Sequence, residues 1–466
     1  MEKNERNGAG AGDVLGRVAK FASLFLVFLP VGSGLLYVRS FGVNVAYGDQ
    51  WRIAQLFGKL SSGTLDFADL WNQLNEHRIL LPRVLMLSLG RLTEWNNVAE
   101  MYATQALLLM ALVILLLAFR RDVGSGSKLL LFVPVAFLVF SFRQAEIMLM
   151  GLLMQFALVL TFAVLAFHFL HVPRARPSGK LAFPAALVSA TLASLSSAHG
   201  LLVWPVGLLQ LVVGPAAKRT KVYFGVIWSW VGTAEWLFYF HGYRVPDRAV
   251  PDRAGEAVAG VLYYPRFFLT SMGSSLSWWQ GPAFVIGALL LVLVAAALLL
   301  ATKDGKLAEH SFFAALMLFA FLVLLSLTVG RAERGIEQAL VSRYTMYSIL
   351  GVVGLYGMLA KLYLDKGSRV ANIAFAALLA CVLFSLPVAY SEGIEVGRAT
   401  EESREWVASV VADYESQPDE TLALIYPNPE VVRRRAPVLE RLGYNVFSSS
   451  VNGARSRPRR AIGKVA

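Results

Sequence analysis

The sequence predicts an all-α polytopic membrane protein with about 11 transmembrane helices. Three observations support this fold class. Hydrophobic residues make up 56% of the 466 residues and charged residues only 16%, and the mean hydropathy is +0.57. Apolar runs such as residues 282–301 reach the roughly 20 residues that an α-helix needs to cross a bilayer. The single cysteine, Cys381, excludes an internal disulfide.

The expected spans are the apolar runs of the chain. They are residues 16–38, 98–119, 129–142, 151–171, 182–198, 200–213, 222–240, 282–301, 310–328, 345–364 and 370–390. The stretch 182–213 fits either two short spans or one long helix. Basic clusters on both of its flanks favour two spans that form a hairpin with its tip at His199 and Gly200.

Basic residues mark alternate loops along this series. When the N-terminus is placed in the cytoplasm, every short loop assigned to the cytoplasmic side contains Lys or Arg, as the positive-inside rule requires. The C-terminus then lies outside the cytoplasmic (inner) membrane. The net charge of +12 is therefore attributed to these loops and not to nucleic-acid binding. The first run shows no convincing cleavage site, so we expect a span there and not a signal peptide.

The longest loop between spans, residues 39–97, falls on the outer face in this topology. Asp49 precedes a segment with apolar residues at helical spacing. The run Glu76-His77-Arg78 precedes a second apolar stretch, residues 79–92, which is too short to cross the membrane. We therefore expect two amphipathic helices in the membrane interface, with Asp49 at one end and the polar run at the other.

These polar residue types fit chemistry on a lipid phosphate. A carboxylate can act as a general base, Glu and His can bind a divalent metal such as Mg or Mn, and Arg binds phosphate through paired hydrogen bonds. The alternative for Asp49 is a helix cap. The alternative for Glu76-His77-Arg78 is a solvated turn or a salt bridge, and not all three side chains can face one way on a helix.

Two further polar positions are expected at the outer ends of middle spans. Arg143 and Glu146 are three residues apart, so they share one face of a helix. They form either a structural ion pair or a contact to phosphate. His199 marks the turn between two apolar spans, where a lone histidine is more often structural than a ligand.

Residues 330–344 form an outer loop that contains three arginines, which runs against the inside bias of basic residues. Arg343, followed by Tyr344, begins a span, and its alternative role is to snorkel to the headgroups. The excess of positive charge favours phosphate binding by Arg331 and Arg343.

The chain is expected to divide into three parts. Residues 1–390 form the transmembrane domain, and residues 391–450 form a small external α/β unit. In that unit we expect helices at 400–415 and 428–442 and strands at 421–426 and 444–448. The basic end, residues 451–466, is expected to be disordered.

Several stretches resemble the GT-C superfamily of membrane glycosyltransferases. They are the acidic residue in a long first external loop, FSFRQAEIMLMGLLMQFALVL at 140–160, SSAHGLLVWPVGLL at 196–209, GRAERGIEQALVSRY at 330–344 and the tail stretch LALIYPNPEVVRRRAPVLERLGYNVF. The resemblance implies a sugar donor carried on a polyprenyl phosphate and a glycan or lipid acceptor of the cell envelope. It implies that Asp49 acts as the base or helps to hold a metal. Many relatives have two adjacent acids there, whereas this chain has Gly48 and Asp49, which puts a paired-carboxylate metal site in doubt.

The function expected from sequence is an inverting, polyprenyl-phosphate-sugar-dependent glycosyltransferase on the outer face. Asp49 and Glu76 are its expected catalytic residues, and Mg or Mn could assist. Its expected substrate-binding residues are His77, Arg78, Arg143, Glu146, His199, Arg331, Arg343 and Tyr344. An O-antigen ligase or polysaccharide polymerase is the alternative enzyme. A transporter or flippase for a lipid-linked sugar would place charges in mid-span, and a non-catalytic scaffold for envelope assembly is the last alternative.

Overall fold

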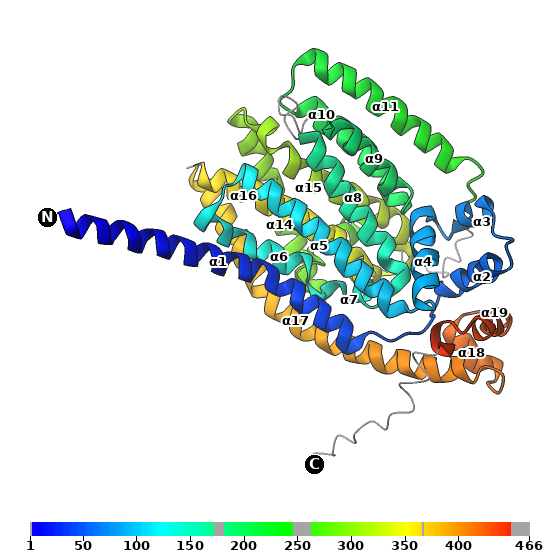
Figure 1. The fold of residues 1–466 in the computed structure, drawn as a ribbon. Helices are drawn as coiled ribbons and strands as arrows, with labels where there is room; N and C mark the ends of the chain where they lie inside the picture. The colour runs from blue at the N-terminus through cyan, green and yellow to red at the C-terminus, as the bar shows by residue number, and fades with distance from the viewer. Residues whose placement is uncertain (1, 172–180, 246–261, 366–367, 449–466) are drawn as a thin grey trace.

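The computed structural model describes residues 2–171, 181–245, 262–365 and 368–448. Within these residues the fold is helical except for one hairpin of two-residue strands (Figure 1). Eight helical segments in the described part are long and apolar enough to cross a membrane. The prediction of an all-helical, multi-pass protein is thus confirmed. The eight segments are Ala22–Phe41, Asn97–Asp122, Lys128–Met148, Gly151–His171, Gln280–Lys303, Leu307–Arg334, Ser342–Leu364 and Arg369–Ala412.

The eight segments contain the long helices of the bundle and several short turns. The long helices are α1 (Glu2–Phe41), α5 (Asn97–Asp122), α8 (Met154–His171), α14 (Gln280–Lys303), α15 (Ser311–Arg331), α16 (Ser342–Leu364) and α17 (Arg369–Ala412). The short pieces are η1 (Gly126–Phe132), α6 (Val133–Val139), η2 (Phe142–Gln144), α7 (Ala145–Met148), η3 (Gly151–Leu153), η6 (Leu307–His310) and η7 (Ala332–Arg334).

The difference from about 11 spans falls between residues 182 and 240. Two of the expected spans there are too short, with 13 residues in α9 and 11 in α10. The third is the 23-residue helix α11, which is rich in Trp and Tyr and contains Glu235, so it is less apolar than the eight spans. The elements of this region are α9 (Ala182–Ser194), η5 (Ala198–Leu202), α10 (Val203–Val213) and α11 (Lys218–Phe240).

The chain turns between α9 and α10, as predicted from the basic flanks. Gly200 sits in this turn, and a Cβ added to it would lie 1.9 Å from the carbonyl oxygen of Ala193. Only glycine therefore permits so close a return of the chain. The turn brings His199 to the same end of the bundle as the loop after α1.

The loop after α1 contains the helix predicted directly after Asp49. The helix α2 begins at the next residue, and its buried face includes Trp51, Ile53 and Phe57. Asp49 occupies the N-cap position, but its side chain makes no capping hydrogen bond. The elements of this loop are α2 (Gln50–Ser61), α3 (Phe67–Trp71), β1 (Gln73–Leu74), β2 (His77–Arg78) and α4 (Leu80–Thr93).

The two ends of the bundle carry different loops. At one end, here called the basic end, Lys306 pairs with Asp365 at 3.2 Å and Lys361 pairs with Glu309 at 3.3 Å. At the other end, here called the loop end, α2, α3, α4, α18 and α19 lie together (Figure 1). Lys306 and Asp365 belong to two loops that the charge pattern assigned to one face, and their ion pair shows that these residues share one end. The remaining elements are α13 (Tyr263–Gly273) and η8 (Ile336–Leu340).

The expected C-terminal α/β unit is wrong, because the structure has helices where strands were predicted. The tail elements are α18 (Asp419–Ile425), α19 (Pro429–Leu442) and η9 (Asn445–Phe447). Leu422 and Ile425, the buried residues of α18, are spaced three apart, and Asp419 and Glu420 occupy its first turn, where acids favour a helix. The expected helices at 400–415 and 428–442 correspond to the end of α17 and to α19. The basic C-terminal stretch of the sequence, residues 451–466, lies outside the described residues.

Asn445 attaches this tail to the loop that contains Asp49. Its side chain is completely buried, accepts from Ala46 N at 2.9 Å, and donates to Asn44 Oδ1 at 3.1 Å and to Trp95 O at 3.2 Å. Its own main-chain N–H donates to Glu94 O at 2.8 Å. Its φ of +60° lies in the left-handed region, which asparagine tolerates better than most residues. The last described turn of the chain thus fixes the segment that leads from α1 to Asp49.

We expect Asn445→Ala to lower the free energy of unfolding by about 2–3 kcal/mol, because three buried side-chain hydrogen bonds are lost at about 1 kcal/mol each. Thermal or denaturant unfolding of the purified protein in detergent measures this, and faster proteolysis of the tail should accompany it. Ser409→Ala is the matched control, since the exposed Ser409 hydroxyl bonds only to a carbonyl of its own helix. Equal stability of the two variants would contradict the anchoring role of Asn445.

Candidate functional site

A short hairpin at the loop end positions the polar run 76–78. Strand β1 pairs with β2 so that Gln73 faces Arg78 and Leu74 faces His77. The turn between them is Asn75 and Glu76, and Asn75 has φ of +52°, a conformation in which asparagine is favoured. The side chains of Asn75, Glu76 and His77 therefore leave the hairpin in different directions.

Arg78 holds the hairpin to the end of α11. Its guanidinium donates from Nε to Tyr239 O at 2.8 Å, from Nη1 to Trp71 O at 3.0 Å and from Nη2 to His241 O at 2.9 Å. The Arg78 main-chain N–H donates to the Tyr239 hydroxyl at 2.8 Å. Two of these carbonyls belong to the C-terminal end of α11, where a positive charge is stabilised by the helix dipole. The residue is only 5% exposed, so its guanidinium acts in the structure as a clamp.

Glu76 pairs with Arg331, more than 250 residues later in the chain. Arg331 Nη2 lies 2.9 Å from Glu76 Oε2, and the side chains are 15% and 25% exposed respectively. The Tyr243 hydroxyl donates to Glu76 O at 3.2 Å. Burial is the largest single influence and raises the pKa of Glu76, but the charge and hydrogen bond of Arg331, a main-chain hydrogen bond and His77 together leave this pKa below its ordinary value. The pair joins the hairpin to the end of α15.

His77 lies beside His199, with ring centroids 5.2 Å apart. Its Nδ1 is 3.2 Å from Ser197 Oγ, and His199 Nδ1 is 3.2 Å from the Tyr347 hydroxyl. The ring of Phe156 packs against both histidines, at 6.5 Å from His77 and 6.1 Å from His199. Burial lowers the pKa of His77 to about 4, so this ring is neutral at physiological pH.

Glu146 pairs with Arg343 and not with Arg143. Arg343 Nη1 lies 2.5 Å from Glu146 Oε1, and about a third of each side chain is exposed, 33% and 32%. Glu146 also lies close enough to Arg404 for an electrostatic interaction, and the Arg404 guanidinium lies 3.3 Å from the centre of the Tyr47 ring. Arg404 therefore lies beside the Glu146–Arg343 pair and adds positive charge to it.

Arg143 is buried, with 1% exposure, and binds main-chain groups. Its Nε donates to Ser277 O at 3.1 Å and its Nη2 donates to Leu340 O at 2.6 Å, while the guanidinium stacks over Trp278 at 4.2 Å. The expected ion pair of Arg143 with Glu146 is therefore absent, because two other chain segments, at 277–278 and at Leu340, supply the acceptors and the aromatic face.

Asp49 lies on the other side of the hairpin turn. Its Oδ2 accepts from Asn75 Nδ2 at 2.8 Å, and its Oδ1 is 4.0 Å from Arg52 Nε. About a third of the side chain, 36%, is exposed. The described residues contain no group of three or more His, Cys, Asp and Glu side chains placed to hold a metal ion.

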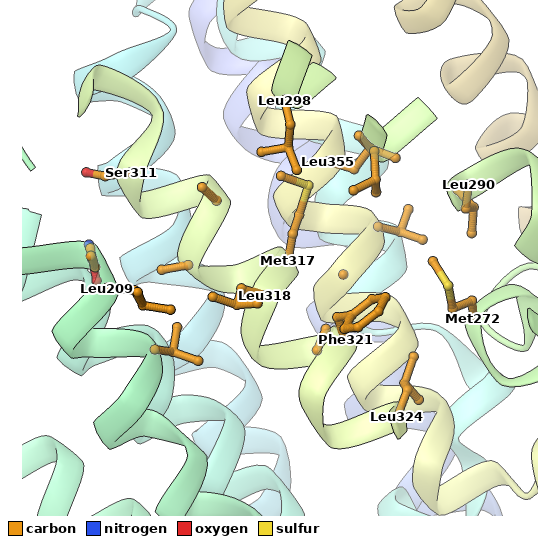
Figure 2. A pocket seen from close by; sticks show the side chains of 18 of the residues that line it. Leu209, Met272, Leu290, Leu298, Ser311, Met317, Leu318, Phe321, Leu324 and Leu355 are labelled. Carbon is orange, nitrogen blue, oxygen red and sulfur yellow. The ribbon is translucent and has the colours of Figure 1, made fainter. Parts of the chain in front are cut away.

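An apolar cavity of about 370 Å³ lies in the bundle between α10, α14, α15 and α16. Figure 2 shows Leu298, Met317, Leu318 and Phe321 from α14 and α15 at this cavity. Leu324, another lining residue, lies seven residues before Arg331 on α15. At about 1.5 Å per helical residue, Leu324 and Arg331 are therefore about 10 Å apart along the axis of α15.

The structure gathers the predicted residues at one end of the bundle in three groups. One group is Glu76 with Arg331, the second is His77 with His199, and the third is Glu146 with Arg343; Tyr344 packs against Phe156, with ring centroids 6.3 Å apart. The sequence reading missed Tyr347, Arg404 and Arg52. Arg52 follows Asp49 by three residues at the start of a predicted helix, a spacing that could have identified it. Tyr347 and Arg404 have no such signal, because they contact residues that are distant along the chain.

Comparison with known proteins provides no family. A protein of Archaeoglobus fulgidus, described as an uncharacterized protein, is 25% identical over 209 residues, which are 41% of this chain and 53% of that protein. The chain thus matches about half the length of this relative. No family model matches the chain, and no solved structure matches it.

By helix length and composition the chain is a polytopic all-helical membrane protein with eight candidate spans in its described part. Its distinctive feature is the loop end, where acids, arginines and histidines from separate spans meet around one hairpin turn.

We expect Arg78→Gln to lower the free energy of unfolding by about 3 kcal/mol or more, because hydrogen bonds from a charged donor are worth about 1.5–3 kcal/mol each. Unfolding in detergent measures the loss. Arg91→Gln is the control, since Arg91 is exposed on α4, and it should change stability by about 0.5 kcal/mol or less. A similar small change in both variants would show that the clamp has no stabilising role.

His77 should make stability depend on pH between about 4 and 6.5. Its folded-state pKa of about 4 lies below its ordinary value of 6.5, so the unfolded chain binds more protons in this window and the free energy of unfolding falls as pH is lowered through it. His77→Gln should reduce this pH dependence and leave stability above pH 7 comparatively unchanged. Unfolding curves at a series of pH values test it, and an unchanged pH slope in the variant would contradict the assignment.

Proposed function

We propose that this protein is a membrane glycosyltransferase that moves a sugar from a polyprenyl-phosphate donor to an envelope glycan or lipid acceptor. The observation that supports the proposal most directly is the partial exposure of arginines at the loop end, close to one end of the apolar cavity. Arg343 and Arg331 keep part of their surface accessible while carboxylates hold them in place. Guanidinium groups of this kind bind phosphate through paired hydrogen bonds.

The apolar cavity, at about 370 Å³, has room for part of the hydrocarbon chain of such a donor. Its lining is nearly all aliphatic or aromatic, and its lining residue Leu324 lies about 10 Å from Arg331 along α15. A lipid whose chain enters this cavity has its phosphate at the level of the arginines. Arg78 and Arg143 are assigned a positioning role, because their donors bind main-chain carbonyls.

The proposed reaction is a single displacement with inversion. The acceptor hydroxyl oxygen forms a bond to the anomeric carbon of the sugar, and the bond from that carbon to the phosphate oxygen breaks. Asp49 accepts the hydroxyl proton. The lipid phosphate leaves with its negative charge, which Arg331 and Arg343 stabilise. Glu76 and Glu146 position these two arginines, and a metal ion is not required for this balance.

The neutral His77 and His199 fit a different part of this reaction. The two rings lie side by side and next to Phe156, and His199 is within hydrogen-bond distance of the Tyr347 hydroxyl. Neutral imidazoles bind hydroxyl groups without adding charge next to the arginines. We assign them to the hydroxyls of the donor sugar. Phe156 and Tyr344 add apolar ring surface to this group.

We expect Asp49→Asn to lower sugar transfer at least about 100-fold, the usual contribution of a general base, with the fold retained. The assay supplies purified protein with polyprenyl-phosphate sugar and measures release of the lipid phosphate, which a transporter does not generate. Asp66→Asn is the matched control: it is the same change in the same loop, and asparagine can still cap α3 as Asp66 does. Full turnover by the Asp49 variant would exclude Asp49 as the base.

A further inference from the structure

A polar pocket of about 540 Å³ lies at the loop end, on the Asp49 side of the hairpin turn. Its walls come from α2, from the hairpin and from the segment that follows α11. Three arginines and three amide side chains line it: Arg52, Arg78, Arg244, Asn72, Gln73 and Asn75.

The pocket is built by a specific cross-link and not by loose surface side chains. Gln73 Nε2 donates to Arg244 O at 2.7 Å, and Gln73 Oε1 accepts from Arg244 N at 3.0 Å. This pair of hydrogen bonds fixes the segment after α11 beside the hairpin. Arg78, in the hairpin, also bonds to the carbonyls of Tyr239 and His241 at the end of α11. The hairpin and the segment after α11 are therefore joined at two points.

The pocket has an excess of positive charge. Three arginines line it, of which Arg78 is bonded to main-chain carbonyls, and the Asp49 carboxylate contacts the lining through Asn75 and Arg52. The Arg52 side chain is 41% exposed and its described contacts are long: a hydrogen bond of 3.4 Å to the Tyr426 hydroxyl and an ion pair of 4.0 Å with Asp49. The Arg244 side chain makes no hydrogen bond or ion pair with another residue in the described part of the chain. Both arginine side chains are exposed, and the ligand that matches a pair of exposed guanidinium groups is an anion.

The pocket is separate from the arginines that we assign to the donor phosphate. Asn75 lines the pocket and donates to Asp49, whereas the next residue, Glu76, turns the other way and pairs with Arg331. The hairpin turn thus lies between two positively charged regions, and in the proposed reaction the acceptor and the donor meet at this turn. Asp49 stands on the pocket side, within reach of a hydroxyl group on a molecule bound there.

We propose that this pocket binds the acceptor, and that the acceptor is an anionic glycan whose carboxylate or phosphate groups are held by Arg52 and Arg244. The role of acceptor rests on the proposed glycosyl transfer, whereas the binding of an anionic glycan does not depend on it. Anchoring the charge at the two arginines places a neighbouring sugar hydroxyl beside Asp49, which gives the base its substrate. A neutral glycan lacks this anchor, because it forms no ion pair with either arginine.

The test is a binding titration of the full chain in detergent with three probes: tri-galacturonate, glucose 6-phosphate and neutral maltotriose. We expect the acidic probes to bind at least about tenfold more tightly than maltotriose, which corresponds to about 1.4 kcal/mol, and to weaken as salt is raised. The stronger of the two acidic probes identifies carboxylate or phosphate as the natural charge. Equal binding of acidic and neutral probes would overturn the proposal.

Arg244→Gln and the double variant Arg52→Gln with Arg244→Gln test the assigned residues. The double variant should lose at least about tenfold in affinity for the acidic probe, and Arg91→Gln should lose none. Arg244→Gln alone is included because its side chain has no described partner, so this change should leave the fold intact. Arg52 also contacts the tail, so a loss of affinity in the double variant could reflect a disturbed fold. Unchanged affinity in both variants, with normal unfolding, would overturn the assignment.

The outcome is distinguishable from failure of the proposed function. The titration requires no transfer, so anionic binding with full activity of Asp49→Asn would reject Asp49 as the base and keep the pocket. Loss of transfer in Asp49→Asn without selective binding of acidic probes would keep the transferase and reject the pocket.

Discussion

The bonds from the Arg78 guanidinium to three carbonyls are the constraint on which the geometry of the loop end depends. A hairpin with two residues in each strand is too short to be stable by itself. Arg78 fixes it by bonding the segment before it, at Trp71, and the end of α11, at Tyr239 and His241. The directions taken by the residues of the turn follow from this attachment. Because the charge is buried, loss of any of these carbonyls would leave a guanidinium donor without its acceptor.

Both acid–arginine pairs of the loop end join elements that are far apart in the sequence. Each carboxylate holds an arginine that would otherwise be mobile, and each leaves that arginine partly exposed. An incoming phosphate therefore competes with a carboxylate for a guanidinium that is already oriented. Such preorganisation lowers the cost of stabilising charge that develops during a reaction.

Local patterns predicted the local features of this fold. The helix after Asp49 follows from apolar spacing, and the turn at His199 and Gly200 follows from the basic clusters beside it. Sequence could not separate the arginines, because Arg78 and Arg343 both lie beside apolar stretches of similar character. Acceptors from other parts of the chain decide whether an arginine is buried and fully hydrogen-bonded, as Arg78 is, or partly exposed, as Arg343 is.

The C-terminal tail shows the same limit. The apolar run TLALIY resembles a strand, but its buried residues and the acids before it favour α18.

The attachment of Asn445 to the segment before Asp49 has a consequence for biogenesis. Residues 44–46 leave the ribosome early, and the side chain that fixes them is made about 400 residues later. Until then the first loop lacks its final support, whatever spans have already entered the membrane. The loop end is thus completed only by the last part of the chain. An unfinished or truncated copy can have its spans in place while the segment before Asp49 lacks its hydrogen bonds to Asn445.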